Sequence, residues 1–310
     1  MLRIATRKSA LALWQAGRVQ ELLRARGVLS ELLPMHTEGD RIVDRSLAEA
    51  GGKGLFVKEL EQALAARRAD LAVHSAKDVP FELPADFILS AFITREDPRD
   101  ALVAPAARTF DNLPRGARVG TSSLRRAVQL LAARPDLVIV PVRGNVPTRV
   151  RRASELDAVV LALAGLRRLG LEAQATQVLP LELSLPAAGQ GAMAVEAVRG
   201  SAGDAAAAPL DDEPTSRCVR AERAVLARLA GGCTVPVAAY AVLDGDRLWL
   251  RAVLGGPDRG GVKLVRAEAR GADAEDLGRA VAEDLLARGG EPLLEAARLQ
   301  AGGLLAPMRA

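Results

Sequence analysis

The feature that most restricts the fold of this chain is an alternation of strand-like and helix-like segments that occurs twice. The first round holds the apolar runs LRIAT, LSELLPMH, DLAVHSA and FILSAFI, with a helix expected from Ser9 as its cap to about Gly27. The second round holds ARVGT, LVIVPV and AVVLAL, each followed by a helical pattern. The charged, proline-containing stretch TREDPRD at 94–100 separates the rounds. Such alternation predicts α/β units with largely parallel sheets.

The C-terminal third follows another pattern. A helical segment near 213–230 precedes the strands PVAAYAVL and RLWLRAVL, which flank a hairpin signal, DGD, at 244–246. A third strand, GVKLVRAEA, and a further helix complete a small α+β unit. Before it, AMAVEAV is typical of a strand that returns to the first unit, and AGDAAAAPLDDEP is typical of a short linker.

Composition limits the class of protein. Hydrophobic residues make up 49% of the chain and charged residues 26%, which is typical of a globular protein. No apolar run is long enough for a membrane span, and the N-terminal residues show no signal-peptide pattern. Two cysteines form neither a disulfide framework nor a C-x-x-C metal site, and His36 and His74 fit structural roles. We therefore expect a cytoplasmic protein without a metal.

Positive charge is concentrated in residues 115–168. This segment holds eleven arginines, no lysine and only three acidic residues, although the whole chain carries a net charge of only +4. Arginine suits the forked recognition of carboxylate or phosphate, so the expected partner is an anion. Only 3% of the residues are aromatic, and the rest of the chain is acidic on balance, which argues against nucleic acid.

Two strand-to-helix turns in this segment combine hydroxyls with arginines. VGTSSLRR spans 119–126 and RGNVPTR spans 143–149. Backbone N–H groups at a helix start can bind an anion, and Arg125 and Arg126 lie in a first turn, where the helix dipole disfavours cations. A bound anion would offset that conflict. The alternative is an ordinary serine cap with two solvated arginines.

Three other stretches allow more than one interpretation. VHSAKDVP, at 73–80, follows a strand, so Lys77 and Asp78 belong either to the rim of a site or to a solvated turn. Cys233 lies on a Gly-Gly loop, where it is either a buried small hydrophobe or a reactive thiol. GQG at 189–191 is too short to be a dinucleotide fingerprint, and GGKGLF at 51–56 lacks the spacing of a nucleotide loop.

Nine stretches in order give the chain a family resemblance. They are IATRKSALALWQA, GGKGLFVKELE, VHSAKDVP, REDPRDALV, VGTSSLRR, RGNVPTR, LALAGLRRLGL, LPAAGQGA and ERAVLARLAGGCTVPVAAYA. Across nearly its whole length the sequence closely resembles the porphobilinogen deaminase (hydroxymethylbilane synthase) family of tetrapyrrole biosynthesis. The resemblance implies two α/β lobes like those of periplasmic binding proteins and a small α+β C-terminal domain. The expected domains are 1–94 with 190–209, 99–186, and 212–310.

The resemblance also implies a transferase reaction on a covalent cofactor. A dipyrromethane would be held by Cys233 through a thioether, and four porphobilinogen molecules would be joined head to tail, each losing ammonia. Water would then release hydroxymethylbilane. Asp78 matches the catalytic aspartate of the family.

Other matched positions imply binding of the carboxylate arms of the pyrroles. Those implied for the cofactor are Lys77, Thr121, Ser123, Arg125, Arg126 and Arg143. Those implied for the substrate are Arg7, Ser9, Phe56, Arg149 and Arg168. The chain departs from many members at Pro147, at Glu38 and in a shortened segment at 150–157.

The expected partner is therefore the small molecule porphobilinogen, bound by a monomer, with no nucleic acid and no membrane partner. The alternative is a non-catalytic anionic-solute-binding protein of the same two-lobed fold. That alternative gives Cys233 no role.

Overall fold

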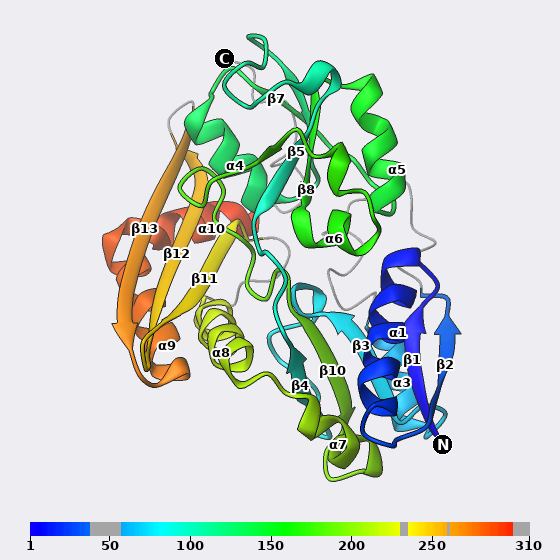
Figure 1. The fold of residues 1–310 in the computed structure, drawn as a ribbon. Helices are drawn as coiled ribbons and strands as arrows, with labels where there is room; N and C mark the ends of the chain where they lie inside the picture. The colour runs from blue at the N-terminus through cyan, green and yellow to red at the C-terminus, as the bar shows by residue number, and fades with distance from the viewer. Residues whose placement is uncertain (38–56, 230–234, 259–260, 300–310) are drawn as a thin grey trace.

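Three sheets organise the protein, as Figure 1 shows for a computed structural model that describes residues 1–37, 57–229, 235–258 and 261–299. Two are five-stranded sheets with helices packed on them, and the third is a three-stranded antiparallel sheet. The predicted fold class, two α/β lobes with a small α+β domain, is confirmed. The expected domain limits stay predictions, although the strands of each sheet fall within them.

The first lobe is built on the sheet order β2-β1-β3-β10-β4. Its strands are β1 (Leu2–Arg7), β2 (Ser30–Met35), β3 (Leu71–Ser75), β4 (Phe87–Ile93) and β10 (Met193–Val198). The first three are parallel, and β10 runs antiparallel to β3 and β4. The expected return of the AMAVEAV segment to this lobe is thus confirmed.

Helices cover both faces of this sheet because β1 alternates. Ile4 packs in a cluster with α1 (Ala10–Arg24), whereas its neighbour Ala5 packs in another with α3 (Lys58–Ala65). Helix α1 begins as predicted, with Ser9 Oγ accepting from the Ala12 N–H at 3.3 Å.

The second lobe has the sheet order β7-β6-β8-β5-β9. Its strands are β5 (Asp100–Val103), β6 (Arg118–Gly120), β7 (Val138–Val140), β8 (Ala158–Ala162) and β9 (Gln177–Val178). Its helices are α4 (Leu124–Ala133), α5 (Val146–Arg151) and α6 (Leu163–Arg168). Strands β6, β7 and β8 are parallel, but β5 is antiparallel to β8 and β9.

The expectation of a largely parallel sheet is therefore only partly correct. Strands β5 and β10 each follow a segment that crosses between the lobes, so they do not belong to a repeated strand–helix–strand unit that would fix a parallel direction.

The third domain packs helices α8 (Glu213–Arg228), α9 (Ala274–Leu285) and α10 (Glu291–Leu299) on the meander β11 (Val237–Asp244), β12 (Arg247–Asp258) and β13 (Gly261–Gly271). The predicted hairpin is confirmed at Gly245, whose φ is +66°. The expected linker near 202–214 is wrong in part, because Ser201 caps a short helix, α7 (Ala202–Ala207). Short 3₁₀ or π turns occupy 76–78, 105–107, 152–155, 172–174, 208–210 and 286–290.

Glu222 of α8 ties the third domain to both segments that cross between the lobes. Its carboxylate accepts two hydrogen bonds from Arg95, at 2.6 and 3.2 Å, and one from the Gly189 N–H at 2.7 Å. It also accepts from the Ala241 N–H at 2.8 Å, and its side chain is not exposed. A carboxylate in this position fixes both crossings against the third domain. In the described parts of the chain, no helix is long and apolar enough to cross a membrane.

Candidate active site

Asp78 lies at the edge of the first sheet where parallel strands end. Strand β3 ends at Ser75, and a 3₁₀ turn, Ala76–Asp78, carries the next residues beyond it. Strand β1, parallel to β3, ends at Arg7, and Ser9 follows as the cap of α1. The carboxyl ends of parallel strands meet at one edge, so the fold gathers Arg7, Lys77 and Asp78 there.

The second lobe presents its own strand ends. Thr121 and Ser123 follow β6, and Thr121 Oγ1 accepts from the Ser123 N–H at 3.1 Å. Ser123 caps α4 by accepting from the Arg126 N–H at 3.4 Å, so the serine cap of the alternative interpretation is present. Arg143 follows β7, and Arg149 lies in α5, where its Nε donates to the Gly144 carbonyl at 2.7 Å.

Charged residues of both lobes act on Arg149. Burial, aided by the positive charge of Arg126, lowers its pKa to about 10, and the Asp78 carboxylate opposes that shift. Arg143 and Arg7 also lower this pKa. Arg149 is therefore a partly buried cation, charged at neutral pH, in the field of Asp78 and of three other arginines from both lobes. Such a group of cations favours the binding of an anion.

Lys77 lies in the same field. Its Nζ donates to Gln190 Oε1 at 3.2 Å. Burial and the nearby Arg126 lower its pKa to about 7, although Asp78 acts in the opposite direction. Asp78 itself is only partly buried, and no group among the described residues donates a hydrogen bond to its carboxylate.

Arg125 and Arg126 have an anion that the protein supplies. Asp100, the first residue of β5, accepts from Arg125 Nη1 at 2.7 Å and from Arg126 Nη2 at 2.8 Å. Arg125 Nη1 also donates to the Leu185 carbonyl, and Arg126 Nη1 to the Val160 carbonyl. The carboxylate of Asp100 thus compensates the unfavourable interaction of these two arginines with the helix dipole. Both arginines are almost fully buried, so the alternative of two solvated arginines is wrong.

The negative charge of the Asp100 carboxylate is compensated by the groups around it. Although burial alone would raise its pKa, the charges and hydrogen bonds of Arg125 and Arg126 hold that pKa well below its usual range. Ser184 Oγ at 2.7 Å and Gln190 Nε2 at 2.9 Å donate two further hydrogen bonds. Sequence reasoning did not single out Asp100 or Gln190. The signals were an acidic residue opening the apolar strand DALV, and a glutamine between two glycines.

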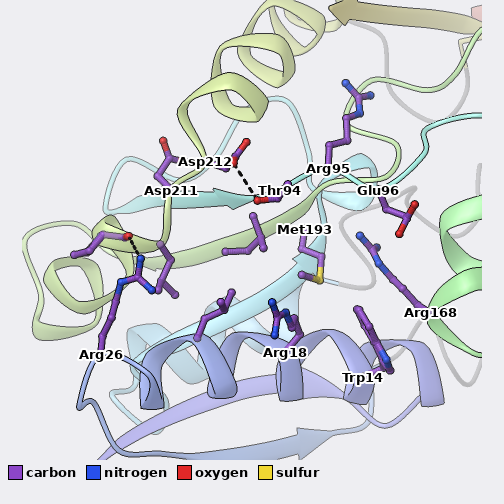
Figure 2. A pocket seen from close by; sticks show the side chains of 14 residues that line it. Trp14, Arg18, Arg26, Thr94, Arg95, Glu96, Arg168, Met193, Asp211 and Asp212 are labelled. Atoms are coloured by element: carbon purple, nitrogen blue, oxygen red, sulfur yellow. Dashed lines mark hydrogen bonds between the residues drawn. The ribbon is translucent and has the colours of Figure 1, made fainter.

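Arg168 lines a cavity of about 410 Å³ (Figure 2). Its guanidinium stacks over the Trp14 ring at 5.6 Å and donates to the Gly191 carbonyl at 2.5 Å. Burial lowers its pKa to about 10. The cavity lies between α1, the end of β4 and the start of α8, and Asp78 is not among its lining residues. Its wall mixes Arg18, Arg26 and Arg95 with the acidic Glu96, Asp211 and Asp212.

Two predicted site residues, Cys233 and Phe56, lie outside the described residues, as does Glu38. The other cysteine, Cys218, is buried in α8, and burial raises its pKa to about 11. His74 is also buried, with Nε2 at 2.8 Å from Glu196. Among the described residues, no group of three or more His, Cys, Asp and Glu side chains could hold a metal ion.

Comparison with known proteins gives a match over most of the chain. Residues 2–205 match the family model "Porphobilinogen deaminase, dipyromethane cofactor binding domain", and residues 216–287 match "Porphobilinogen deaminase, C-terminal domain". The porphobilinogen deaminases of Bordetella parapertussis and Bordetella bronchiseptica are each 54% identical over 300 residues, covering 94% of this chain and 95% of the relative.

Solved structures give a weaker likeness. A periplasmic substrate-binding protein of an ABC transporter from Coxiella burnetii has a TM-score of 0.43 and 13% identity, over 68% of this chain and 91% of its own. The L-cystine solute receptor of Neisseria gonorrhoeae has a TM-score of 0.40 and 15% identity, over 69% and 86%. TM-scores below 0.5 do not assign the chain to a family. The two family models and the 54% identity show that this chain belongs to the porphobilinogen deaminase family.

Proposed function

We propose that this chain catalyses the reaction of its family, the head-to-tail joining of four porphobilinogen molecules with loss of ammonia and the release of hydroxymethylbilane. The observation that carries the proposal is the arrangement around Asp78. Its carboxylate accepts no hydrogen bond from the described residues, and it lies in a field of cationic side chains from both lobes.

The cationic groups fit the dipyrromethane cofactor and the substrate, because each pyrrole of either carries two carboxylates. Arg7, Arg143 and Arg149 supply forked donors, and Thr121 and Ser123 supply hydroxyls at the start of α4. When bound, the cofactor supplies the terminal pyrrole to which the first substrate unit is joined. Arg125 and Arg126 already share the Asp100 carboxylate, so in this proposal they bind a pyrrole arm only through the donors that Asp100 leaves available.

In this proposal, Asp78 stabilises the positive charge that forms on the substrate during the reaction. A porphobilinogen that loses ammonia acquires a delocalised positive charge, and a fixed carboxylate beside it stabilises that charge. The same carboxylate accepts hydrogen bonds from pyrrole N–H groups. The arginines hold the carboxylate arms, so the two signs of charge act on different parts of one substrate. Arg149, with its pKa of about 10, stays protonated for this role at neutral pH.

Ser9, Phe56 and Arg168 complete the proposed substrate contacts. Ser9 is the cap of α1, just after the end of β1, and Arg168 lines the cavity beside Trp14, which Asp78 does not line. The position of Arg168 suits a contact with a lengthening chain rather than with the reacting ring.

Cys233 is the proposed attachment point of the cofactor. The other thiol, Cys218, is buried and has a raised pKa, which disfavours the nucleophilic thiolate. A monomer in the cytoplasm completes the proposal.

The test is an assay of the purified protein with porphobilinogen as the sole substrate. The expected result is the release of one ammonia per porphobilinogen consumed and the formation of hydroxymethylbilane. Binding of porphobilinogen without turnover would favour the non-catalytic solute-binding alternative and contradict the proposal.

A further inference from the structure

The turn Gly189-Gln190-Gly191 lies where the chain returns from the second lobe to the first. Gly189 and Gly191 have φ values of +73° and +91°, a region that favours glycine. A Cβ at Gly189 would approach the Ala76 carbonyl carbon and the Lys77 nitrogen, both at 3.1 Å, and one at Gly191 would overlap the Glu96 carbonyl oxygen. Gly189 therefore lets this turn pack directly against the segment that carries Asp78, and Gly191 lets it pack against the crossing segment at Glu96.

Hydrogen bonds to its main-chain atoms fix the turn against α8 and against the crossing segment at Arg95 and Glu96. The Gly189 N–H donates to Glu222 of α8, and the Gln190 carbonyl accepts from Arg95 Nε at 2.8 Å. The Gly191 carbonyl accepts from the Glu96 N–H at 3.1 Å. The Gln190 side chain is 1% exposed, so its position is set by the protein interior.

The Gln190 amide spans the two lobes. Its Oε1 accepts from Lys77 Nζ at 3.2 Å, and its Nε2 donates to Asp100 Oδ1 at 2.9 Å and to the Pro98 carbonyl at 2.6 Å. A glutamine amide is both acceptor and donor, which is what an ammonium on one side and a carboxylate on the other require. Neither a carboxylate nor an apolar side chain makes both contacts.

We propose that Gln190 is a positioning residue for the family reaction: its amide joins Lys77, beside Asp78, to the Asp100–Arg125–Arg126 cluster and so holds the Lys77 ammonium in place. The effect of Gln190 on catalysis rests on the proposed function of the chain. The contacts themselves are made by the protein's own residues.

The surroundings of Lys77 make its protonation sensitive to this amide. The charged groups that act on it are Arg126 and Arg125, which disfavour the ammonium, and Asp78 and Asp100, which favour it. Burial also disfavours the charge, and the net result is a pKa of about 7. An acceptor at 3.2 Å favours the charged form, so its removal lowers the pKa of Lys77 further.

The test compares Gln190→Met with Gln129→Met in the purified holoprotein. Gln129 is also a buried glutamine, with hydrogen bonds to Arg125 and Leu185, but it does not contact Lys77. Lys77 is acetylated by a trace of acetic anhydride across a pH series, and the yield is read from its peptide by mass spectrometry. The midpoint should fall by about one pH unit in Gln190→Met and stay in place in Gln129→Met.

The alkaline limb of kcat/KM for porphobilinogen should move with that midpoint in Gln190→Met only. Should Gln190→Met not fold, Gln190→Asn, too short to reach both partners, replaces it with the same expectation. An unmoved Lys77 midpoint, or equal movement in Gln129→Met, overturns this inference. A wild-type protein that consumes no porphobilinogen defeats the proposed function instead, so the two failures are distinguishable.

Discussion

Asp100 and Asp78 belong to different lobes and have opposite surroundings. Asp100 has no exposed surface and accepts hydrogen bonds from two arginines, a serine and a glutamine. Asp78 is partly buried, and no group among the described residues donates to it, although cationic side chains from both lobes surround it.

The difference shows that a carboxylate's role follows from its partners. A carboxylate whose oxygens are all engaged holds the structure together and has nothing left to offer a substrate. One that lies in the same positive field and accepts no hydrogen bond from the described residues is available to a new cation. The same contrast separates the arginines, because Arg125 and Arg126 donate to the Asp100 carboxylate, whereas among the described residues Arg149 donates to the Gly144 carbonyl.

The largest effect is expected for Asp100→Asn. The substitution leaves two buried guanidinium groups without their counter-charge, which costs about 3–5 kcal/mol of stability. Urea unfolding followed by circular dichroism measures the change. A loss below about 1 kcal/mol would show that Asp100 is not the structural carboxylate of the pair.

Asp78→Asn should have the converse effect. Turnover of porphobilinogen should fall by roughly 10²-fold or more, because an electrostatic contact to the developing positive charge is lost, while stability stays close to that of the wild type. Steady-state kinetics and urea unfolding measure the two quantities. Asp86→Asn, an exposed aspartate of the same lobe, is the control and should leave kcat unchanged. Near-normal turnover in Asp78→Asn would remove its proposed role.

Lowering the pH should reduce the contribution of Asp100 to the free energy of unfolding. Its pKa is lowered in the folded protein, so its contribution to stability is complete above its unfolded value near 3.8 and is lost as the pH falls towards the folded pKa. The stability difference between wild type and Asp100→Asn should therefore shrink by up to about 1.4 kcal/mol per pH unit below pH 4. Urea unfolding at several values between pH 5 and pH 3 measures it. A difference that stays constant over this range contradicts the assignment.

The smallest effect on stability is expected for an arginine–carboxylate pair that is exposed to water. Glu283 of α9 accepts from Arg228 Nε at 2.5 Å, but both side chains are about half exposed. Water screens such a pair, so Glu283→Gln should cost less than about 1 kcal/mol. A cost as large as that of Asp100→Asn would mean that burial does not explain the contrast.

Local signals predicted most of the elements. Ser9 caps α1 as expected, and DGD forms the hairpin between β11 and β12. The direction of β5 could not be predicted, because strand direction depends on how the chain crosses between lobes rather than on the apolar pattern of the strand.

The site was predictable to the level of residues at strand ends, Asp78 and several arginines among them, but not of their distant partners. The dipole argument at Arg125 and Arg126 predicted a bound anion, whereas the structure has the carboxylate of Asp100, which lies 25 residues away in sequence from Arg125. Gln190 was missed for the same reason, since its partners, Lys77 and Asp100, become neighbours only when the lobes are folded together.

Intact mass spectrometry of the purified protein tests the central claim most directly, namely that this cleft builds its product on a primer held by Cys233. The account predicts an added mass of two linked pyrrole units on the wild type and on Cys218→Ser, and its absence from Cys233→Ser. A wild-type protein that consumes porphobilinogen while its mass is that of the unmodified chain would contradict it.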